Sequence, residues 1–415
     1  MPYQNDQTSR QKAVLAAVDT GAFDAEVSIK ELMSLADTAG ADTLAYVIQP
    51  LKTPDNAAYF GSGKLLELKE MLHNLGADLL IVDDELTGVQ LRNIENAVEK
   101  PVVDRTMLIL DIFAARAQTK EGKLQVELAQ QKYILPRLIG MGQALSRQGG
   151  GIGTRGPGET KLETDRRYLH SRIHHLNEAL KEVKRHRELT RARRKKNRVP
   201  VVAIVGYTNA GKSTLLNTLT GAGVLAENKL FATLDPTARE LTLPNGRTVI
   251  LIDTVGLISR LPHDLVEAFH STLEEAKSAD IILQVCDASD PQVRQQNAVT
   301  AQVLADLGCG DTPTILVCNK ADKLPEAPAH TSENTVYLCA KTGEGVDRML
   351  KLLTNILDQS TVRSELELPY TKMDLLHFLH ANGKVTEEKY TETGLKIAFE
   401  LDNADYGILM HMLEE

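Results

Sequence analysis

The sequence predicts an α/β protein of several domains, and three observations support this. Apolar, β-branched runs alternate with amphipathic stretches both before residue 105 and after residue 198, as in parallel α/β units. Between these regions, leucines recur with the spacing of about 3.5 residues that long packed helices use. The chain has 415 residues, 42% of them apolar and 25% charged, which is enough for several cores.

We divide the chain into four parts. They are an N-terminal parallel α/β domain (1–104), a long antiparallel helical hairpin (105–198) with a glycine-rich tip (139–159), a P-loop nucleotide-binding domain (199–360) and a small C-terminal α+β domain (361–415). In the first part, strands are expected at 14–18, 43–48, 79–82 and 102–103, with helices at 25–39, 63–75 and 87–98.

The hairpin is predicted from two stretches in which aliphatic residues recur with the spacing of a coiled-coil seam. One comprises Leu124, Leu128, Leu135 and Leu138; the other comprises Leu162, Leu169, Ile173, Leu176, Leu180 and Val183. Two such helices in tandem most simply pack antiparallel along these seams. The second helix, from about 161 to 196, should be on the order of 50 Å long.

The segment that joins these helices contains six glycines in the ten residues 149–158, with Arg147 and Arg155 beside them. An antiparallel pair needs only about 2–8 connecting residues, so a loop over 139–159 exceeds what topology requires. Glycines let backbone N–H groups approach phosphates or RNA closely. A purely flexible linker is the alternative interpretation.

The second hairpin helix is strongly basic. Residues 160–198 contain fourteen Lys/Arg and five Asp/Glu, a net charge of +9 in a chain whose total is −9. This distribution predicts contact with a phosphate backbone, although a solvated helix face is the alternative. The residues expected to contact RNA are Arg147, Arg155, Arg191, Arg193, Arg194 and Lys195.

A phosphate-binding loop follows the apolar strand predicted at 201–205. The sequence Gly206-Tyr-Thr-Asn-Ala-Gly-Lys-Ser213 combines a nest of backbone N–H groups, a lysine for the β- and γ-phosphates and a serine for Mg²⁺. The residues expected to line the nucleotide here are Gly206, Tyr207, Thr208, Asn209, Ala210, Gly211, Lys212, Ser213 and Thr214.

Three further motifs follow predicted strands. Asp253-Thr-Val-Gly256 offers a carboxylate that can hold Mg²⁺ through water and an N–H for the γ-phosphate. Asn319-Lys320-Ala-Asp322 selects guanine, because its aspartate accepts from N1–H and the 2-amino group, a donor pair that adenine lacks. In Cys339-Ala340-Lys341, the N–H of Ala340 is expected to face guanine O6. Four motifs in order predict binding of GTP and GDP.

A switch segment is expected between the first two motifs. Phe231 and Thr233 are placed beside the nucleotide, with Thr233 as the Mg²⁺ ligand and Thr237 as the alternative; either could instead cap a turn. The catalytic set is Lys212, Thr233, Asp253 and Gly256. Leu257 follows, where many GTPases carry a water-orienting glutamine, so slow hydrolysis that a partner stimulates is expected.

Several classes of protein are disfavoured. No apolar run approaches the length of about 20 residues that a membrane span needs. The N-terminus lacks the apolar core of a signal peptide. The four cysteines, at 286, 309, 318 and 339, show no metal spacing, which suits a reducing cytoplasm. Cys286, Cys318 and Cys339 stand at the ends of apolar strands and are expected to be buried. Residues 361–415 carry no catalytic constellation.

Motifs along nearly the full length resemble the HflX family of ribosome-associated GTPases. They are Gly61-Ser-Gly-Lys64, Asp83-Asp-Glu-Leu86 with Gln90, the run 104–113, Gln125-Val-Glu-Leu-Ala129, the run 149–163 and Asp253-Thr-Val-Gly-Leu-Ile258. The glycine-rich run is the most specific of them. Leu257 stands where the family usually has phenylalanine, and Cys339 where it usually has serine.

The resemblance implies a Ras-like G domain, Mg²⁺ as cofactor and a cytoplasmic monomer that binds the 50S subunit and its rRNA. It further implies dissociation of idle or stalled 70S ribosomes, with the hairpin tip near the peptidyl-transferase centre. Some members bind ATP through the N-terminal domain, but residues 1–104 contain no nucleotide loop. Related GTPases with asparagine at position 209 hold K⁺ beside the phosphates; the alternative is that this side chain only braces the loop. The alternative functions are a GTPase partner in tRNA modification or ribosome assembly, and a non-catalytic RNA-binding scaffold.

Overall fold

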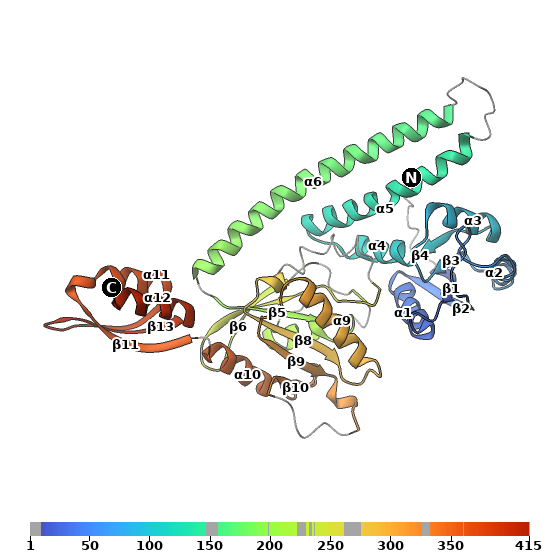
Figure 1. Cartoon of the computed structure of the whole chain (residues 1–415). Coiled ribbons are helices and arrows are strands. Elements are labelled where there is room, and N and C mark those ends of the chain that lie inside the picture. The colour runs from blue at the N-terminus through green and yellow to red at the C-terminus, as the bar shows by residue number, and fades with distance from the viewer. Residues whose placement is uncertain are drawn as a thin grey trace.

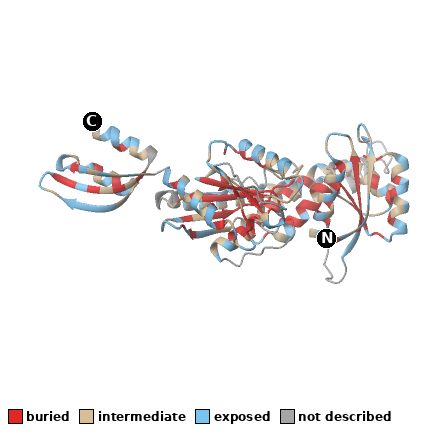
Figure 2. Cartoon of the chain, turned by 90° about the horizontal axis from the view of Figure 1, so that it is seen from below, coloured by how far each residue is buried: buried red, intermediate tan, exposed pale blue. Residues whose placement is uncertain are grey.

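The computed structural model describes residues 10–146, 157–197, 199–221, 230–231, 235, 237–260, 275–325, 333–359 and 361–414. In Figure 1, the N-terminal and nucleotide-binding domains lie side by side, the hairpin extends above both, and the C-terminal domain projects from the opposite end. The buried residues gather in each domain and continue from the N-terminal domain into its neighbour (Figure 2). The mixed α/β class is therefore confirmed.

The N-terminal sheet is parallel, with the strand order β2-β1-β3-β4. The strands are β1 (Gln11–Asp19), β2 (Ala41–Pro50), β3 (Leu79–Val82) and β4 (Val102–Asp104); the helices are α1 (Ala25–Thr38), α2 (Ser62–Asn74) and α3 (Gly88–Val98). Side-chain caps fix where helices begin: Asp24 accepts from the Val27 N–H at 3.1 Å, and Thr87 forms a capping box with Gln90. The predicted strands and helices are confirmed.

Three helices follow: α4 (Arg105–Arg116), α5 (Lys120–Ser146) and α6 (Pro157–Asn197). The flanks of the predicted tip are helical, so the loop expected over 139–159 is shorter than predicted. Single glycines at 140 and 142 cost a helix only about 1 kcal/mol each, and proline suits the first helical position, where α6 begins. Residues 147–156, with Arg147 and Arg155, lie outside the described residues.

The packing of α5 differs from a simple two-helix coil. Among its described residues, the buried apolar side chains are Val126, Ala129 and Tyr133, and they join the core built on α4. The predicted leucine repeat of α5 is only half-buried. On α6, Leu169 and Leu176 are buried. The first hairpin helix is thus fastened to the N-terminal domain, because its most buried side chains serve that core.

The nucleotide-binding domain has a six-stranded sheet with the order β10-β9-β8-β5-β7-β6, in which only β6 runs antiparallel to its neighbour. Its strands are β5 (Val201–Gly206), β6 (Thr237–Thr242), β7 (Thr248–Asp253), β8 (Ile281–Asp287), β9 (Thr314–Asn319) and β10 (Thr335–Tyr337). Its helices include α7 (Lys212–Thr220), α9 (Val293–Asp306) and α10 (Val346–Gln359).

The C-terminal domain is an antiparallel sheet with the order β11-β13-β12 and two helices. Its elements are β11 (Thr361–Pro369), α11 (Asp374–Asn382), β12 (Lys384–Tyr390), β13 (Gly394–Asp402) and α12 (Asn403–Glu414). Leucines from the sheet and the helices form its own core, as an α+β module requires. In the described part of the chain, no helix combines the length and apolar character needed to cross a membrane.

We expect Leu176→Ala to lower the free energy of unfolding by about 2–5 kcal/mol, because it removes a buried side chain (2% exposed) from the hairpin seam. Leu189→Ala on the same helix is the matched control, since Leu189 is 56% exposed; its effect should stay within about 0.5 kcal/mol. Denaturant unfolding monitored by circular dichroism measures both. Equal losses for the two variants would contradict this account of the seam.

Candidate nucleotide-binding site

The motifs predicted from the sequence meet at one edge of the six-stranded sheet. Parallel strands present their carboxyl ends together, and the register pairs Ile204 of β5 with Asp253 of β7. Likewise Asp287 at the end of β8 pairs with Asn319 at the end of β9. Ligand sites of open α/β sheets lie at this edge, so the arrangement fits a nucleotide site.

The P-loop adopts the conformation that its glycines predict. Gly211 has φ +95°, and a Cβ there would lie 2.2 Å from Asn319 Nδ2, so no other residue fits. Asn209 has φ 60° and an exposed side chain. The hydroxyl of Thr208 is buried without a hydrogen-bond partner in the structure. A buried donor at the loop suits a ligand rich in oxygen atoms.

The ammonium group of Lys212 is buried inside the loop. It donates to the carbonyl oxygens of Gly206 at 3.1 Å and Tyr207 at 2.9 Å. Burial lowers the pKa of Lys212 to about 8, and the nearby carboxylate of Asp253 only partly opposes this shift. A phosphate beside this lysine would favour the charged form.

Two oxygen donors lie where a magnesium ion is predicted. The hydroxyl of Ser213 donates to Asp253 Oδ2 at 2.8 Å, which places a hydroxyl and a carboxylate together at the start of α7. Hard oxygen donors that leave room for phosphate and water are what Mg²⁺ requires, so these residues fit the ion. The third predicted ligand, Thr233, lies outside the described residues, and the alternative, Thr237, begins β6 and pairs with Asp253.

Asn319 connects the P-loop to the guanine-recognition loop. Its amide donates to the Ala210 carbonyl at 2.8 Å, and its oxygen accepts from the Ala340 N–H at 2.9 Å. This differs from the expectation that the Ala340 N–H faces guanine O6, because the buried asparagine oxygen takes that donor instead. Asp322 lies on an exposed turn of 3₁₀-helix (Ala321–Lys323), with its carboxylate accessible to a base.

Lys320 links the end of β9, which carries the guanine-recognition motif, to the P-loop. Its ammonium donates to the Asn209 carbonyl at 2.9 Å and forms an ion pair with Asp287 at 2.7 Å. The pKa of Asp287 is lowered: burial opposes the shift, but hydrogen bonds from Lys320 and Ser289 outweigh it. Asp287 was not predicted from the sequence, although its place at the end of an apolar strand was a usable signal.

The Cys339-Ala340-Lys341 loop is closed by its backbone. The Cys339 N–H donates to the Glu344 carbonyl at 2.9 Å, and Thr218 of α7 donates to the Ala340 carbonyl at 2.6 Å. Cysteine in place of the family's serine therefore leaves the loop closed. All four cysteines are free and buried, which confirms the prediction of burial for Cys286, Cys318 and Cys339.

The Asp-x-x-Gly segment packs directly on the P-loop. A Cβ on Gly256 would lie 2.7 Å from Thr208 Cγ2 and 3.0 Å from Lys212 Nζ, so only glycine fits. The next residue, Leu257, donates to Gly206 and accepts from Thr208, with N···O distances of 3.1 and 2.7 Å. Its side chain is buried and cannot orient water.

Phe231 does not lie where it was predicted. Its ring packs edge-to-face on Phe113 of α4, with ring centroids 4.6 Å apart, and it is buried in the core shared with the N-terminal domain. The free energy gained by burying the Phe231 ring in this core exceeds what the ring would gain beside a polar ligand. Asp235, Ser259 and Arg260, which contact the other domain, were not predicted from the sequence either.

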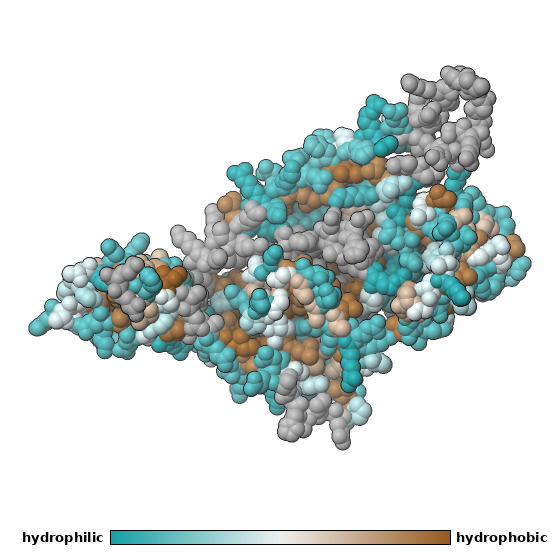
Figure 3. All heavy atoms as spheres, viewed as in Figure 1, coloured by the Kyte–Doolittle hydropathy of each residue, from teal (hydrophilic) through white to brown (hydrophobic). Residues whose placement is uncertain are grey.

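The predicted RNA contacts are only partly described. Arg191, Arg193, Arg194 and Lys195 lie on α6, but their side chains are outside the described set. Figure 3 shows hydrophilic side chains along the outer edge of the hairpin and hydrophobic ones between its helices. The exposed basic side chains that the structure describes on α6 include Arg166, Arg167, Lys184 and Arg185.

Four family models match consecutive parts of the chain. Their descriptions are "GTP-binding GTPase N-terminal" (26–114), "GTP-binding GTPase Middle Region" (116–194), "50S ribosome-binding GTPase" (201–320) and "HflX C-terminal domain" (326–409).

Two relatives named "GTPase HflX" match most of the chain. The one from Caldanaerobacter subterraneus is 53% identical and covers 94% of this chain and 91% of its own; the one from Escherichia coli is 44% identical and covers 82% of each. Among solved structures, a GTP-binding protein from Sulfolobus solfataricus with GDP is 23% identical. It covers 84% of this chain and 99% of its own, with a TM-score of 0.47.

We expect binding of GDP at pH 9 to take up about one proton, because the free protein holds Lys212 mostly neutral above its pKa of about 8 and the phosphates restore its charge. Affinity should therefore fall as the pH rises above 8. At pH 7 Lys212 already carries its proton and takes up none. Calorimetry in buffers of different ionisation enthalpy counts the protons, and equal counts at pH 7 and pH 9 would contradict the burial of this ammonium.

Proposed function

This chain belongs to the HflX family of GTPases, and from that premise we propose that it works on the ribosome: it binds the 50S subunit and dissociates idle or stalled 70S ribosomes. The observation that supports this most directly is the form of the hairpin. Helix α6 has 41 residues and extends beyond the nucleotide-binding domain. It lies almost wholly within the segment 160–198, whose net charge is +9, and it adjoins the glycine-rich run 149–158.

The charge and the tip serve different steps in this proposal. Lysines and arginines along α6 neutralise rRNA phosphates and release counterions, which supplies affinity without sequence specificity. Because the tip is rich in glycine, it carries few side chains, and such a tip would suit a crowded RNA cavity. Arg147, Arg155, Arg191, Arg193, Arg194 and Lys195 are the proposed contacts. The protein would act as a monomer in the cytoplasm, on ribosomes.

GTP hydrolysis follows from the residues at the sheet edge. In this proposal Asp322 would select the base, Lys212 would neutralise the phosphates, and the N–H of Gly256 would donate to the γ-phosphate. Ser213 and Thr233 would ligate Mg²⁺ directly and Asp253 would hold it through water, and the ion would neutralise the charge that develops on the phosphates. Leu257 is buried and apolar, so the chain offers no side chain there to orient water. Hydrolysis should be slow until the ribosome completes the site.

We expect K⁺ to accelerate hydrolysis relative to Na⁺ by about tenfold or more, because a monovalent ion held by the exposed side chain of Asn209 would replace a missing arginine beside the phosphates. Hydrolysis rates in KCl and NaCl at equal ionic strength, with 50S subunits present, provide the measurement. Asn209→Ala should lose the difference. Identical rates in the two salts for the native chain would rule out this role of potassium.

We expect deletion of residues 149–158, with the helices rejoined by a short turn, to leave GTP binding intact and abolish 70S dissociation measured by light scattering. The comparison variant replaces Arg191, Arg193, Arg194 and Lys195 with alanine. It should bind 50S subunits more weakly, and the slope of its salt dependence should be shallower by about 0.7–0.9 for each phosphate that is no longer neutralised. If the tip-deleted protein splits 70S particles at the native rate, the tip is a linker and the proposal is wrong.

A further inference from the structure

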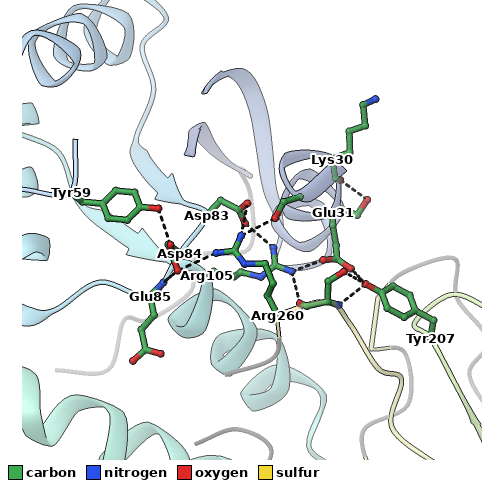
Figure 4. A network of polar contacts seen from close by, with 12 residues as sticks. Lys30, Glu31, Tyr59, Asp83, Asp84, Glu85, Arg105, Tyr207 and Arg260 are labelled. Carbon is green, nitrogen blue, oxygen red and sulfur yellow. Dashed lines mark hydrogen bonds and ion pairs between the residues drawn. The ribbon is translucent and has the colours of Figure 1, made fainter. Parts of the chain in front are cut away.

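The N-terminal domain and the helices that follow it contact the nucleotide-binding domain at the two segments that are predicted to flank the γ-phosphate. One contact set involves Ser259 and Arg260, just after the Asp-x-x-Gly motif. The other involves Phe231 and Asp235, on either side of the predicted switch threonine. Neither set belongs to the nucleotide site itself. Figure 4 shows the first set, in which side chains from the two domains converge.

The backbone at Ser259 is held from both domains. Its carbonyl accepts from Arg105 Nη2 at 3.0 Å, and its N–H donates to the hydroxyl of Tyr207 in the P-loop. That hydroxyl in turn donates to Glu31 of α1. The segment carrying Gly256 therefore ends in a three-way junction between the P-loop, α1 and α4.

Arg260 is fixed by the N-terminal domain. It forms ion pairs with Asp83 at 3.4 Å and Asp84 at 3.1 Å, and its guanidinium lies 4.0 Å from the ring centroid of Phe23. Its φ is 53°, a region that a residue with a long side chain rarely occupies. Strain of this kind persists where the surroundings enforce it, and here these contacts supply the enforcement.

The second set joins the switch segment to the hairpin. The carboxylate of Asp235 accepts from the N–H groups of Gln118 at 2.8 Å and Thr119 at 2.9 Å, directly before α5 begins at Lys120. A carboxylate is stabilised at the N-terminal end of a helix by the helix dipole. On the other side of the switch, Phe231 is anchored on Phe113.

The hairpin in turn is fastened to the same domain. Asp104, the residue before Arg105, accepts from the Leu86 N–H at 2.9 Å and from the hydroxyl of Tyr133 on α5. Arg137 of α5 donates to the Leu86 carbonyl at 2.7 Å, and its guanidinium lies 3.3 Å from the ring centroid of Tyr133. Two adjacent residues, Asp104 and Arg105, thus tie the hairpin and the segment after the Asp-x-x-Gly motif to the junction between β4 and α4.

We infer that Asp235 and Arg260 are positioning residues that couple the hairpin to GTP hydrolysis. A displacement of the hairpin is transmitted to the nucleotide site by two routes. One is Asp235 at the start of α5, and the other is the Arg105–Ser259 contact together with the contacts of Arg260. This inference rests on the proposed function, since binding of the 50S subunit is what displaces the hairpin. The same contacts should also make 50S affinity depend on which nucleotide is bound; by linkage, 50S binding then changes the relative affinities for GTP and GDP by the same factor.

The test measures three quantities in the full chain: GTP affinity, hydrolysis with and without 50S subunits, and 50S affinity with GDP or a non-hydrolysable GTP analogue. Asp235→Asn and Arg260→Gln should keep GTP affinity and basal hydrolysis near native values. The preference of 50S for one nucleotide state should fall about tenfold, within the usual range of coupling between binding sites. Stimulation of hydrolysis by 50S subunits should also fall, by a factor that need not equal the change in binding. Arg260→Lys, which keeps the charge, should restore part of the stimulation.

Arg239→Gln and Asp311→Asn make the same chemical changes at exposed positions of the nucleotide-binding domain and serve as controls. Both should behave as the native chain does. Stimulation in Asp235→Asn and Arg260→Gln equal to the native value overturns the inference while leaving the proposed function intact. A native chain that 50S subunits neither bind nor stimulate overturns both. Loss of basal hydrolysis along with stimulation would show that these residues support the fold or the site, and would also overturn it.

Discussion

The buried guanidinium of Arg105 is the interaction on which the arrangement of the domains depends. It is 2% exposed and lies between Glu31 and Asp83, and removing an ion from water costs several kcal/mol unless partners compensate. Glu31 lies on α1 and Asp83 follows β3. The two ion pairs therefore fix the start of α4, where Arg105 lies, against α1 and the end of β3. The same guanidinium reaches Ser259 of the other domain, so the domain boundary is also set there.

The surroundings of this network keep both of its donors protonated. It raises the pKa of Tyr207, and the adjacent carboxylate of Glu31 raises it further, so the hydroxyl remains a donor. For Arg105, burial lowers the pKa, but the carboxylates of Glu31 and Asp83 together outweigh it and raise the pKa, so the positive charge is retained. A phenol that must donate and a guanidinium that must stay charged give the interface a single hydrogen-bonding pattern. A defined geometry between the domains follows from that pattern.

The nucleotide site depends on a second constraint, the parallel order of β5, β7, β8 and β9. Strands in this order present their last residues to the same edge, so motifs separated by over a hundred residues become neighbours. Asn319 illustrates the result, since its side chain joins Ala210 of the P-loop to Ala340 of the guanine loop. Lys320 and Asp287 add a charged contact at the same edge.

The sequence alone determined the element order, the four nucleotide motifs and the antiparallel hairpin, because each depends on local spacing or on residue chemistry that a motif displays. The loop around 139–159 was predicted too long, because glycine signals a break but an extended helix tolerates single glycines. Phe231 was placed beside the nucleotide, because its neighbours in sequence suggested the switch and nothing there revealed Phe113 as a partner.

Only the tertiary structure decided how the domains meet. Glu31, Asp83, Arg105, Tyr207 and Arg260 are scattered over more than two hundred residues, and no periodicity relates them. Their pairing depends on which faces of the two domains come together, and that choice is made by long-range burial of charge. The sequence therefore predicted the chemistry of the site, whereas the connection between that site and the hairpin required the folded chain.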